Sequence, residues 1–318
     1  SRPFEATRFS FKDVLSHLMK ESNLLLSGSC DLGGATGCLD KSMTPILKNN
    51  FSGNYIHYGI REHAMGAIMN GIVIGKKIRC CGGTFLAFSD YMRPAIRMSA
   101  LMKVPTIFVF SHDSIGVGED GATHQPVEQL TSLQGIPNLN VFRPADALET
   151  LECLECALRS EAPSAIILSR QDLLSVRFSG GVNLCENGGY LIYENGSAAG
   201  TMVTLIATGS EVGLALEVKK MLDDSRITAN VTSIPCWNLF NRQDYAYKSH
   251  VLGNGLRIGI EASNGFGWDQ YLGQNGLFFG VNDFGKSCSC ADIYKYFKLT
   301  ATNIYGNIIR KLDELDKY

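Results

Sequence analysis

The sequence lacks the features that mark several classes of protein. Its longest apolar runs, such as residues 107–110, are far shorter than the ~20 residues that a helix needs to cross a bilayer. No stripe or run of Lys and Arg is present, and the 29 basic and 31 acidic residues leave a net charge of −2. We therefore expect neither a membrane nor a nucleic acid as a partner.

Signals for targeting and for two common chemistries are also missing. No signal peptide opens the chain, and its first residue is Ser1 rather than Met, which predicts a cut upstream. No G-x-S-x-G nucleophile elbow is present. GEDG at residues 118–121 is not followed by an Asn at the spacing of a metal ligand, so we assign no metal ligand to this chain.

Cysteine is plentiful, with ten residues, but its spacing predicts no zinc site. Cys153 and Cys156 form a C-x-x-C inside a helical pattern, and no second pair with a supporting histidine follows. Free thiols are typical of a reducing compartment, which predicts a cytoplasmic protein.

Apolar runs alternate with amphipathic segments in both halves of the chain. The expected strands are residues 24–26, 55–60, 77–81, 105–111, 141–142 and 165–168, then 202–207, 227–234 and 256–260. The expected helices are residues 10–20, 61–74, 88–102 and 145–159, then 211–222 and 241–249. This alternation predicts an α/β protein with mostly parallel sheets covered on both faces. Pro94 falls inside one helical stretch and predicts a kink there.

A change of texture divides the chain. Residues 172–189 are loop-like and contain two Gly-Gly pairs, and the alternation restarts after them. We therefore predict two tandem α/β domains, residues 1–180 and residues 181–318. In the second domain, Gly209 and Ser210 are typical of a turn and a helix N-cap.

The densest polar stretch is SHDSIGVGEDGATHQP at residues 111–126, directly after an apolar strand pattern. Ligands of open α/β sheets bind beyond the carboxyl ends of the strands. The glycines of the stretch let its backbone approach a ligand closely. A polar surface loop and a binding loop both fit this sequence.

Glu62 lies between Arg61 and His63 in YGIREHAMG, where a strand pattern runs into an apolar helical pattern. Acids are common in the first turn of a helix because they meet the positive end of the helix dipole. The local sequence favours that interpretation, and a buried catalytic carboxylate is the alternative.

Other candidates stand alone in the local sequence. Single arginines such as Arg8 and Arg170 usually lie on the surface. Asp31, in GSCDLGG, fits an N-cap, a turn residue or a ligand equally well. A spaced aromatic set follows Gly82 and Gly83 and is more typical of a core than of a cofactor pocket. This set is Phe85, Phe88 and Tyr91.

Together, several long motifs resemble the transketolase family. They are YIHYGIREHAMGAIMNGI, GGTFLAFSDY, HDSIGVGEDGATHQP, VFRPADALE and LSRQ, followed by ATGSEVGLAL and EASNGFGWDQY. Over essentially the whole chain, their order resembles that family's pyrimidine-binding domain followed by its C-terminal domain. The resemblance implies a thiamine diphosphate enzyme of the pentose phosphate pathway. Such an enzyme transfers a two-carbon ketol unit from a ketose phosphate to an aldose phosphate.

The resemblance also implies roles for individual residues. Glu62 matches the catalytic glutamate that hydrogen-bonds the aminopyrimidine ring nitrogen, and Asp31 matches an acidic residue close to the cofactor. The aromatic pocket around the ring is matched by Phe85, Phe88 and Tyr91. The groups that bind the substrate phosphate in the family are matched by Arg8, His112 and Arg170. The groups that contact the sugar hydroxyls are matched by Asp120 and His124. His124 is expected to relay protons as the second catalytic residue.

The chain departs from the family pattern in two ways. Ala35 stands where the family has a phosphate-binding Ser, so phosphate binding is expected to be weaker unless Thr36 substitutes. The diphosphate-binding domain, with its Mg²⁺ or Ca²⁺ ligands, is absent. We therefore expect the chain to hold only the pyrimidine half of thiamine diphosphate and to be inactive alone. Its expected partner is a diphosphate-binding half, in a homodimer or a heterotetramer, encoded separately or removed by a cut.

Other identities remain open. The β subunit of a two-component 2-oxo acid dehydrogenase has this length and domain order, and 1-deoxyxylulose 5-phosphate synthase is a weaker alternative. The phosphate- and sugar-matching residues of the 111–126 stretch argue against both. A non-catalytic module that only dimerises is favoured by the missing domain and Ala35, but the presence of Glu62 and His112 argues against it.

Overall fold

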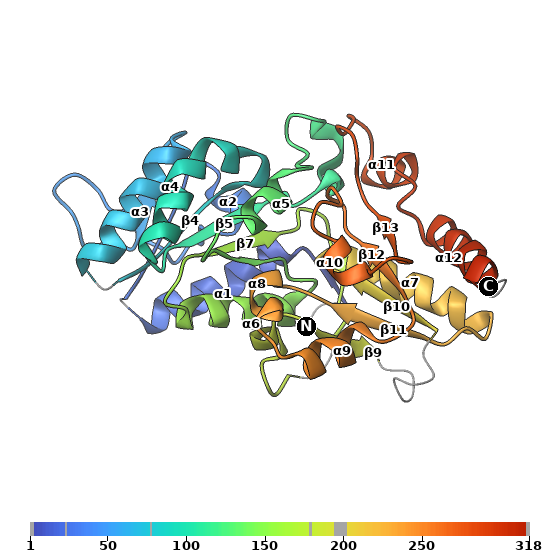
Figure 1. The fold of residues 1–318 in the computed structure, drawn as a ribbon. Helices are drawn as coiled ribbons and strands as arrows, with labels where there is room; N and C mark the ends of the chain where they lie inside the picture. The colour runs from blue at the N-terminus through green and yellow to red at the C-terminus, as the bar shows by residue number, and fades with distance from the viewer. Residues whose placement is uncertain (1–2, 23, 77, 178–179, 194–201, 316–318) are drawn as a thin grey trace.

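Two open sheets, one in each half of the chain, organise the fold of this computed structural model (Figure 1). The structure describes residues 3–22, 24–76, 78–177, 180–193 and 202–315, so Lys77 of a predicted strand and residues 178–179 of the predicted loop lie outside it. The first sheet has six parallel strands in the order β3-β2-β4-β5-β7-β6. The second has the order β13-β12-β10-β11-β9 and is parallel except at β9. The predicted α/β class is confirmed.

The strands of the first sheet follow the predicted apolar runs, with shifted ends. They are β2 (Leu25–Ser29), β3 (Tyr55–His57), β4 (Arg79–Phe85), β5 (Ile107–Ser111), β6 (Asn140–Phe142) and β7 (Ser164–Leu168). β3 ends before the predicted residue 60 because Gly59 takes a φ of 70°, which no strand continues through. β4 continues through Gly82 and Gly83, because helix side chains pack where their Cβ atoms would be.

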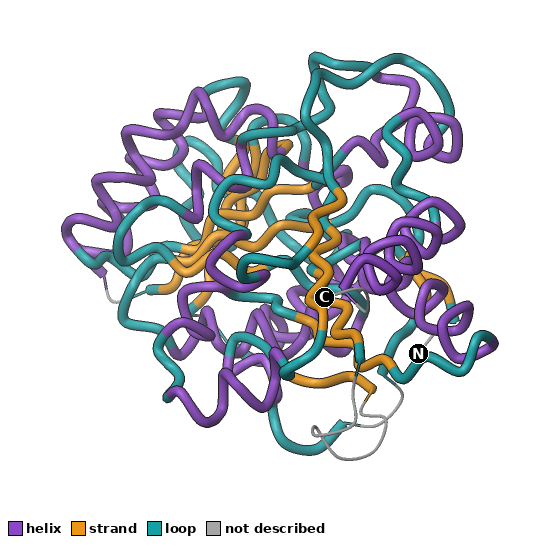
Figure 2. The backbone as a smooth tube through the Cα atoms, turned by 45° about the vertical axis from the view of Figure 1, so that its right-hand side comes forward, coloured by secondary structure: helices purple, strands orange, loops and turns teal. Residues whose placement is uncertain are grey.

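Helices cover both faces of the first sheet (Figures 1 and 2). Apolar side chains of α3 (Glu62–Lys76) and α4 (Ser89–Met102) form a core with one face. Those of α1 (Thr7–Glu21) and α6 (Ala147–Arg159) form a core with the other face. Pro94 lies in the second turn of α4, and the helix continues through it to Met102.

The second half repeats this layering. Its strands are β9 (Tyr190–Tyr193), β10 (Val203–Ala207), β11 (Ala229–Ser233), β12 (Leu256–Ile260) and β13 (Leu277–Phe279). Its helices are α7 (Glu211–Asp224), α8 (Trp237–Asn241), α9 (Tyr245–Leu252), α10 (Asp269–Leu272), α11 (Cys290–Tyr296) and α12 (Ala301–Leu315). The first strand of this sheet, β9, follows the predicted boundary near residue 180, which itself stays a prediction.

Ser210 occupies the predicted N-cap position, because α7 begins at Glu211. Its side chain makes no capping hydrogen bond to α7, and its hydroxyl lies 2.9 Å from Asp113 Oδ2 of the first domain. The hydroxyl therefore donates to a buried carboxylate of the other domain, and its oxygen accepts no hydrogen bond from the backbone of its own helix. None of the helices in the described part of the chain has the length and apolarity that a membrane crossing requires.

Candidate active site

The polar stretch after β5 forms the floor of the candidate site. Residues 111–118 are all buried, so this part is not an open surface loop. The segment turns through the 3₁₀ helix η2 (Ile115–Asp120), where Gly118 and Gly121 take φ values of 79° and 78°. Residues other than glycine rarely adopt such backbone angles, so these glycines fix the path of the loop.

Glu62 combines the two interpretations that its sequence left open. It is the first residue of α3, where a carboxylate meets the positive end of the helix dipole. Its side chain is also buried, at 8% exposed. Thr84 on β4 donates a hydrogen bond to Glu62 Oε1 at 3.2 Å, which orients the carboxylate.

The aromatic set forms a ladder from the interior to the surface. The rings of Phe85 and Phe88 stack with centroids 5.8 Å apart, and Phe88 lies 6.1 Å from Tyr91. Phe85 is 9% exposed, whereas Tyr91 is 68% exposed. The set is therefore not a core stripe, and the His124 ring lies against it, 5.3 Å from Phe88.

His112 lies where the aromatic ladder meets two arginines. Its ring stacks on Phe85 at a centroid distance of 3.6 Å, and its backbone takes a φ of 62°. Burial, together with the nearby charges of Arg8 and Arg170, lowers the pKa of His112 to about 3. The ring is therefore neutral at ordinary pH. Its Nδ1 lies 2.9 Å from the Ser111 hydroxyl.

Arg8 and Arg170 come from opposite ends of the first domain. A two-stranded antiparallel sheet, β1 (Phe4–Glu5) with β8 (Leu173–Leu174), joins the two segments. Burial and the charge of Arg170 lower the pKa of Arg8, and its Nε is buried without a partner. An anion between these guanidinium groups would relieve both their repulsion and this missing hydrogen bond.

The two remaining acids make fewer contacts. Asp31 follows β2 with a φ of 57°. Burial, together with the charges of Glu62 and Asp31, raises the pKa of Cys30 to about 11. Asp31 and Glu62 therefore border the same thiol. Asp120 is exposed at the end of η2 and, within the described residues, hydrogen-bonds none of the other candidates.

Comparison with known proteins identifies this arrangement. Residues 5–175 match the family described as "Transketolase, pyrimidine binding domain", and residues 188–300 match "Transketolase-like TK C-terminal domain". The chain belongs to the transketolase family. It is 45% identical over 310 residues to the transketolase of Sinorhizobium medicae, covering 96% of this chain and 44% of that protein. The chain thus spans about half the length of the curated relatives it matches.

Solved transketolase structures share the fold. The Pichia stipitis transketolase in complex with sedoheptulose 7-phosphate matches with a TM-score of 0.93 at 36% identity, covering 100% of this chain and 47% of that one. A chain described as a split gene transketolase, an inactive β4 tetramer, matches with a TM-score of 0.80 at 24% identity. That match covers 97% of this chain and 98% of the other. Because the identity is only 24%, it shows the fold alone.

Thr36 does not supply the hydroxyl that Ala35 lacks in this transketolase chain. Its side chain is fully buried, and its hydroxyl donates to the Leu32 carbonyl of its own short helix at 3.0 Å. Ala35 instead offers its backbone carbonyl, which accepts from Arg8 Nη1 at 3.2 Å. This contact holds Arg8 beside the site.

Sequence reasoning missed a buried ion network that joins the two transketolase domains. Arg143, after β6, lies 2.7 Å from Asp113 and 2.6 Å from Glu211 at the start of α7. Burial opposes the charge of Arg143, but the carboxylates of Glu211, Asp113 and Glu261 raise its pKa above the usual value. Arg143 stands in the quoted VFRPADALE motif, so its position beyond a strand end was the available signal.

A phosphate-loop spacing in the second domain is not a phosphate site. Residues 280–287 read GVNDFGKS, which matches G-x-x-x-x-G-K-S. The Ser287 hydroxyl is bonded to the Glu119 carbonyl, and Lys286 Nζ lies over the Tyr296 ring at 4.7 Å. The following helix, α11, begins only at Cys290, so its N-terminus does not close the loop as that motif requires.

All ten cysteines are free thiols. Across the described ranges, no three His, Cys, Asp or Glu side chains gather as a metal site would require.

Proposed function

We propose that this chain is the pyrimidine-binding half of a thiamine diphosphate-dependent enzyme that transfers a two-carbon ketol unit between sugar phosphates. The observation that carries the proposal is the placement of Glu62. A buried carboxylate is oriented by Thr84 on β4, and the ladder of aromatic rings begins at the next residue, Phe85, and opens at Tyr91. A planar heterocycle that stacks on aromatic rings and presents a ring nitrogen to a carboxylate fits this arrangement.

The residues of the chain divide the chemistry among them. When bound, thiamine diphosphate supplies the carbon nucleophile and the electron sink for the transferred unit. Glu62 holds a proton at the pyrimidine ring nitrogen, and Asp31 borders the same end of the site. Phe85, Phe88 and Tyr91 orient the ring. His124, against the aromatic ladder, moves protons at the sugar hydroxyls, which Asp120 also binds.

The phosphate of the sugar binds at the other end of the site. After burial, the charges of Arg8 and Arg170 lower the pKa of His112, so both arginines lie on the side of the site that holds this ring. Arginine stays charged and binds phosphate with two parallel hydrogen bonds. His112 is neutral there and contributes one further donor or acceptor to the bound phosphate.

The proposal includes a diphosphate-binding partner that carries Mg²⁺ or Ca²⁺. The chain covers only 44% of the Sinorhizobium medicae protein, and a similar fold exists as a separate chain in a split gene transketolase described as inactive. We propose that this chain assembles with such a half, as a homodimer of rejoined chains or as a heterotetramer. Its ten free thiols support a cytoplasmic location.

Reconstitution tests this function. The chain alone is expected to be inactive, and mixing it with the preceding half of the Sinorhizobium medicae transketolase is expected to restore ketol transfer. The assay uses xylulose 5-phosphate, a ligand of the Pichia stipitis enzyme, as donor and an aldose phosphate as acceptor. Turnover by the chain alone would contradict the half-enzyme proposal. Turnover of pyruvate, without that of the ketose phosphate, would favour the 2-oxo acid dehydrogenase alternative.

Acid is expected to destabilise the chain partly through His112. The unfolded chain binds a proton on this side chain below its ordinary pKa of 6.5, whereas the folded chain does so only near 3. The contribution of His112 to the free energy of unfolding is therefore fully present above pH 6.5. It is lost between pH 6.5 and 3, with a slope of up to about 1.4 kcal/mol per pH unit.

Urea unfolding at several pH values measures the effect. His112→Gln is expected to flatten the loss of stability below pH 6.5, relative to the unmutated chain. His17→Gln, at an exposed position of α1, serves as the control and should leave the profile unchanged. Parallel profiles for the unmutated chain and His112→Gln would show that His112 is not kept neutral by the fold.

A further inference from the structure

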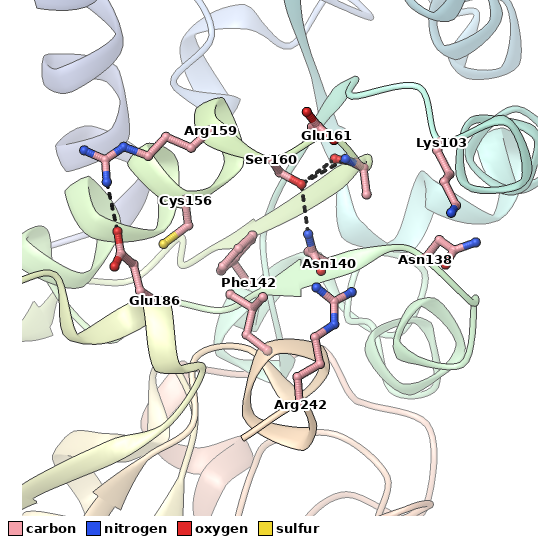
Figure 3. A pocket seen from close by; sticks show the side chains of 12 residues that line it. Lys103, Asn138, Asn140, Phe142, Cys156, Arg159, Ser160, Glu161, Glu186 and Arg242 are labelled. Atoms are coloured by element: carbon pink, nitrogen blue, oxygen red, sulfur yellow. Dashed lines mark hydrogen bonds and ion pairs between the residues drawn. The ribbon is translucent and has the colours of Figure 1, made fainter. Parts of the chain in front are cut away.

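A pocket lies near the amino ends of strands of the first sheet, whereas the candidate active site lies beyond their carboxyl ends. It has a volume of about 520 Å³ and is lined by residues at or before the amino ends of β6 and β7, together with the ends of α4, α6 and α8 (Figure 3). The active-site candidates follow the carboxyl ends of the strands instead. No residue assigned to ketol transfer lines this pocket.

Among the described residues, two of the cations that border the pocket are unpaired, although Glu161 also lines it. Within the described chain, the side chains of Lys103 and Arg242 make no ion pair or hydrogen bond. Arg159 differs, because it pairs with Glu155 at 2.6 Å and with Glu186 at 2.9 Å. In Figure 3, Ser160 separates the Glu161 side chain from Arg242. The part of the pocket beside Lys103 and Arg242 therefore favours an anion.

The inner wall of the pocket holds a polar oxygen atom that lacks a partner. Asn140 is 3% exposed; its Nδ2 donates to Ser160 Oγ at 3.2 Å, but its Oδ1 is buried without a hydrogen bond. A buried polar atom left unsatisfied destabilises the fold, so this wall favours a ligand that brings a hydrogen-bond donor.

The rim of the pocket has a fixed shape. Lys103 and Asn138 both take left-handed backbone angles, with φ values of 53° and 64°. Both donate to the same acceptor, the Ala100 carbonyl, from Lys103 N at 3.3 Å and from Asn138 Nδ2 at 3.4 Å. Such angles are costly for a residue other than glycine, and they are often kept where a site needs them.

We propose that this pocket binds a small phosphorylated polyol. Its phosphate lies between Lys103 and Arg242, and a hydroxyl donates to Asn140 Oδ1. Arg242 follows α8 of the second domain, whereas the other two residues belong to the first. The ligand therefore joins the two domains, and its binding stabilises their contact. The proposal does not depend on ketol transfer.

Titration calorimetry with glycerol 3-phosphate tests the site. The chain carries Arg8→Ala and Arg170→Ala, which remove the phosphate-binding residues of the active site. Saturable binding with a dissociation constant at or below about 1 mM is expected. Adding Lys103→Gln and Arg242→Gln should weaken binding at least tenfold, whereas Lys41→Gln and Arg97→Gln, which remove the same charge elsewhere on the surface, should not.

Inorganic phosphate and glycerol separate the two parts of the ligand. Inorganic phosphate should bind more weakly than glycerol 3-phosphate, and glycerol alone should not saturate. Equal binding of the two phosphates would overturn the role of Asn140. No saturation, or equal weakening by the control pair, would overturn the site. A circular dichroism melt of each variant confirms that it is folded before it is titrated.

Discussion

Glu62→Gln is expected to lower the rate of ketol transfer by the reconstituted enzyme by a factor of about 10²–10⁴, the usual contribution of a positioned acid or base. The amide keeps the size of the side chain and still accepts the hydrogen bond from Thr84. It loses the negative charge and the ability to hold a proton at the ring nitrogen. The loss should therefore fall on kcat, while the KM of the sugar phosphate changes little, because Arg8 and Arg170 are untouched.

Glu217→Gln is the matched control, since this acid is exposed on α7 and lies outside the site. It should retain full activity. Unfolding curves for both variants must agree with that of the unmutated chain, so that the loss is assigned to chemistry. Full activity of Glu62→Gln would remove the main support for catalysis by this chain and would favour the dimerising module.

Arg143→Met is expected to have the largest effect on stability, about 3–5 kcal/mol in the free energy of unfolding. The substitution keeps much of the apolar stem but leaves the carboxylates of Asp113 and Glu211 buried without their cation. Urea unfolding of the isolated chain measures this loss directly. Because Asp113 directly follows His112, the same variant should also weaken phosphate binding at the active site.

A second substitution and a surface arginine test the cause. Glu211→Gln in the Arg143→Met background should recover part of the stability, because it removes one of the two unpaired charges. Arg159→Met is the matched control. This arginine also pairs with two carboxylates, but it is 66% exposed, so its loss should cost less than about 1 kcal/mol. Equal losses for both arginines would contradict a buried network.

Much of the fold follows from apolar runs. β12 at Leu256–Ile260 has the predicted bounds, because four of its five residues are buried and apolar or small, and the fifth is the half-buried Arg257. The ends of β3 and β4 were shifted because glycine permits both a turn and a strand, and only the packing of neighbouring helices decides between them. The missing capping hydrogen bond at Ser210 has a similar origin, since its side chain bonds to an acceptor that is 97 residues away.

The local sequence predicted the candidate site less well than it predicted the fold. Charge density drew attention to residues 111–126, but their burial depends on the second domain that packs over them. The arginine of the buried network looked like any surface arginine, because its two carboxylate partners lie 30 and 68 residues away. Glu62, Arg8 and Arg170 gained their roles only through the family resemblance.

The short sheet formed by β1 and β8 links phosphate binding to fraying of the chain. Two residue pairs, Phe4 with Leu174 and Glu5 with Leu173, hold the segment of Arg8 against that of Arg170, together with buried hydrogen bonds between Thr7 and Ser169. Fraying that reaches the contacts between Thr7 and Ser169 separates the two arginines, so that frayed state loses the bound phosphate. By mass action, an anion at this site shifts the equilibrium toward the paired state by RT ln(1 + [L]/Kd). The substrate itself would thus protect the first residues of the chain from proteolysis and hydrogen exchange.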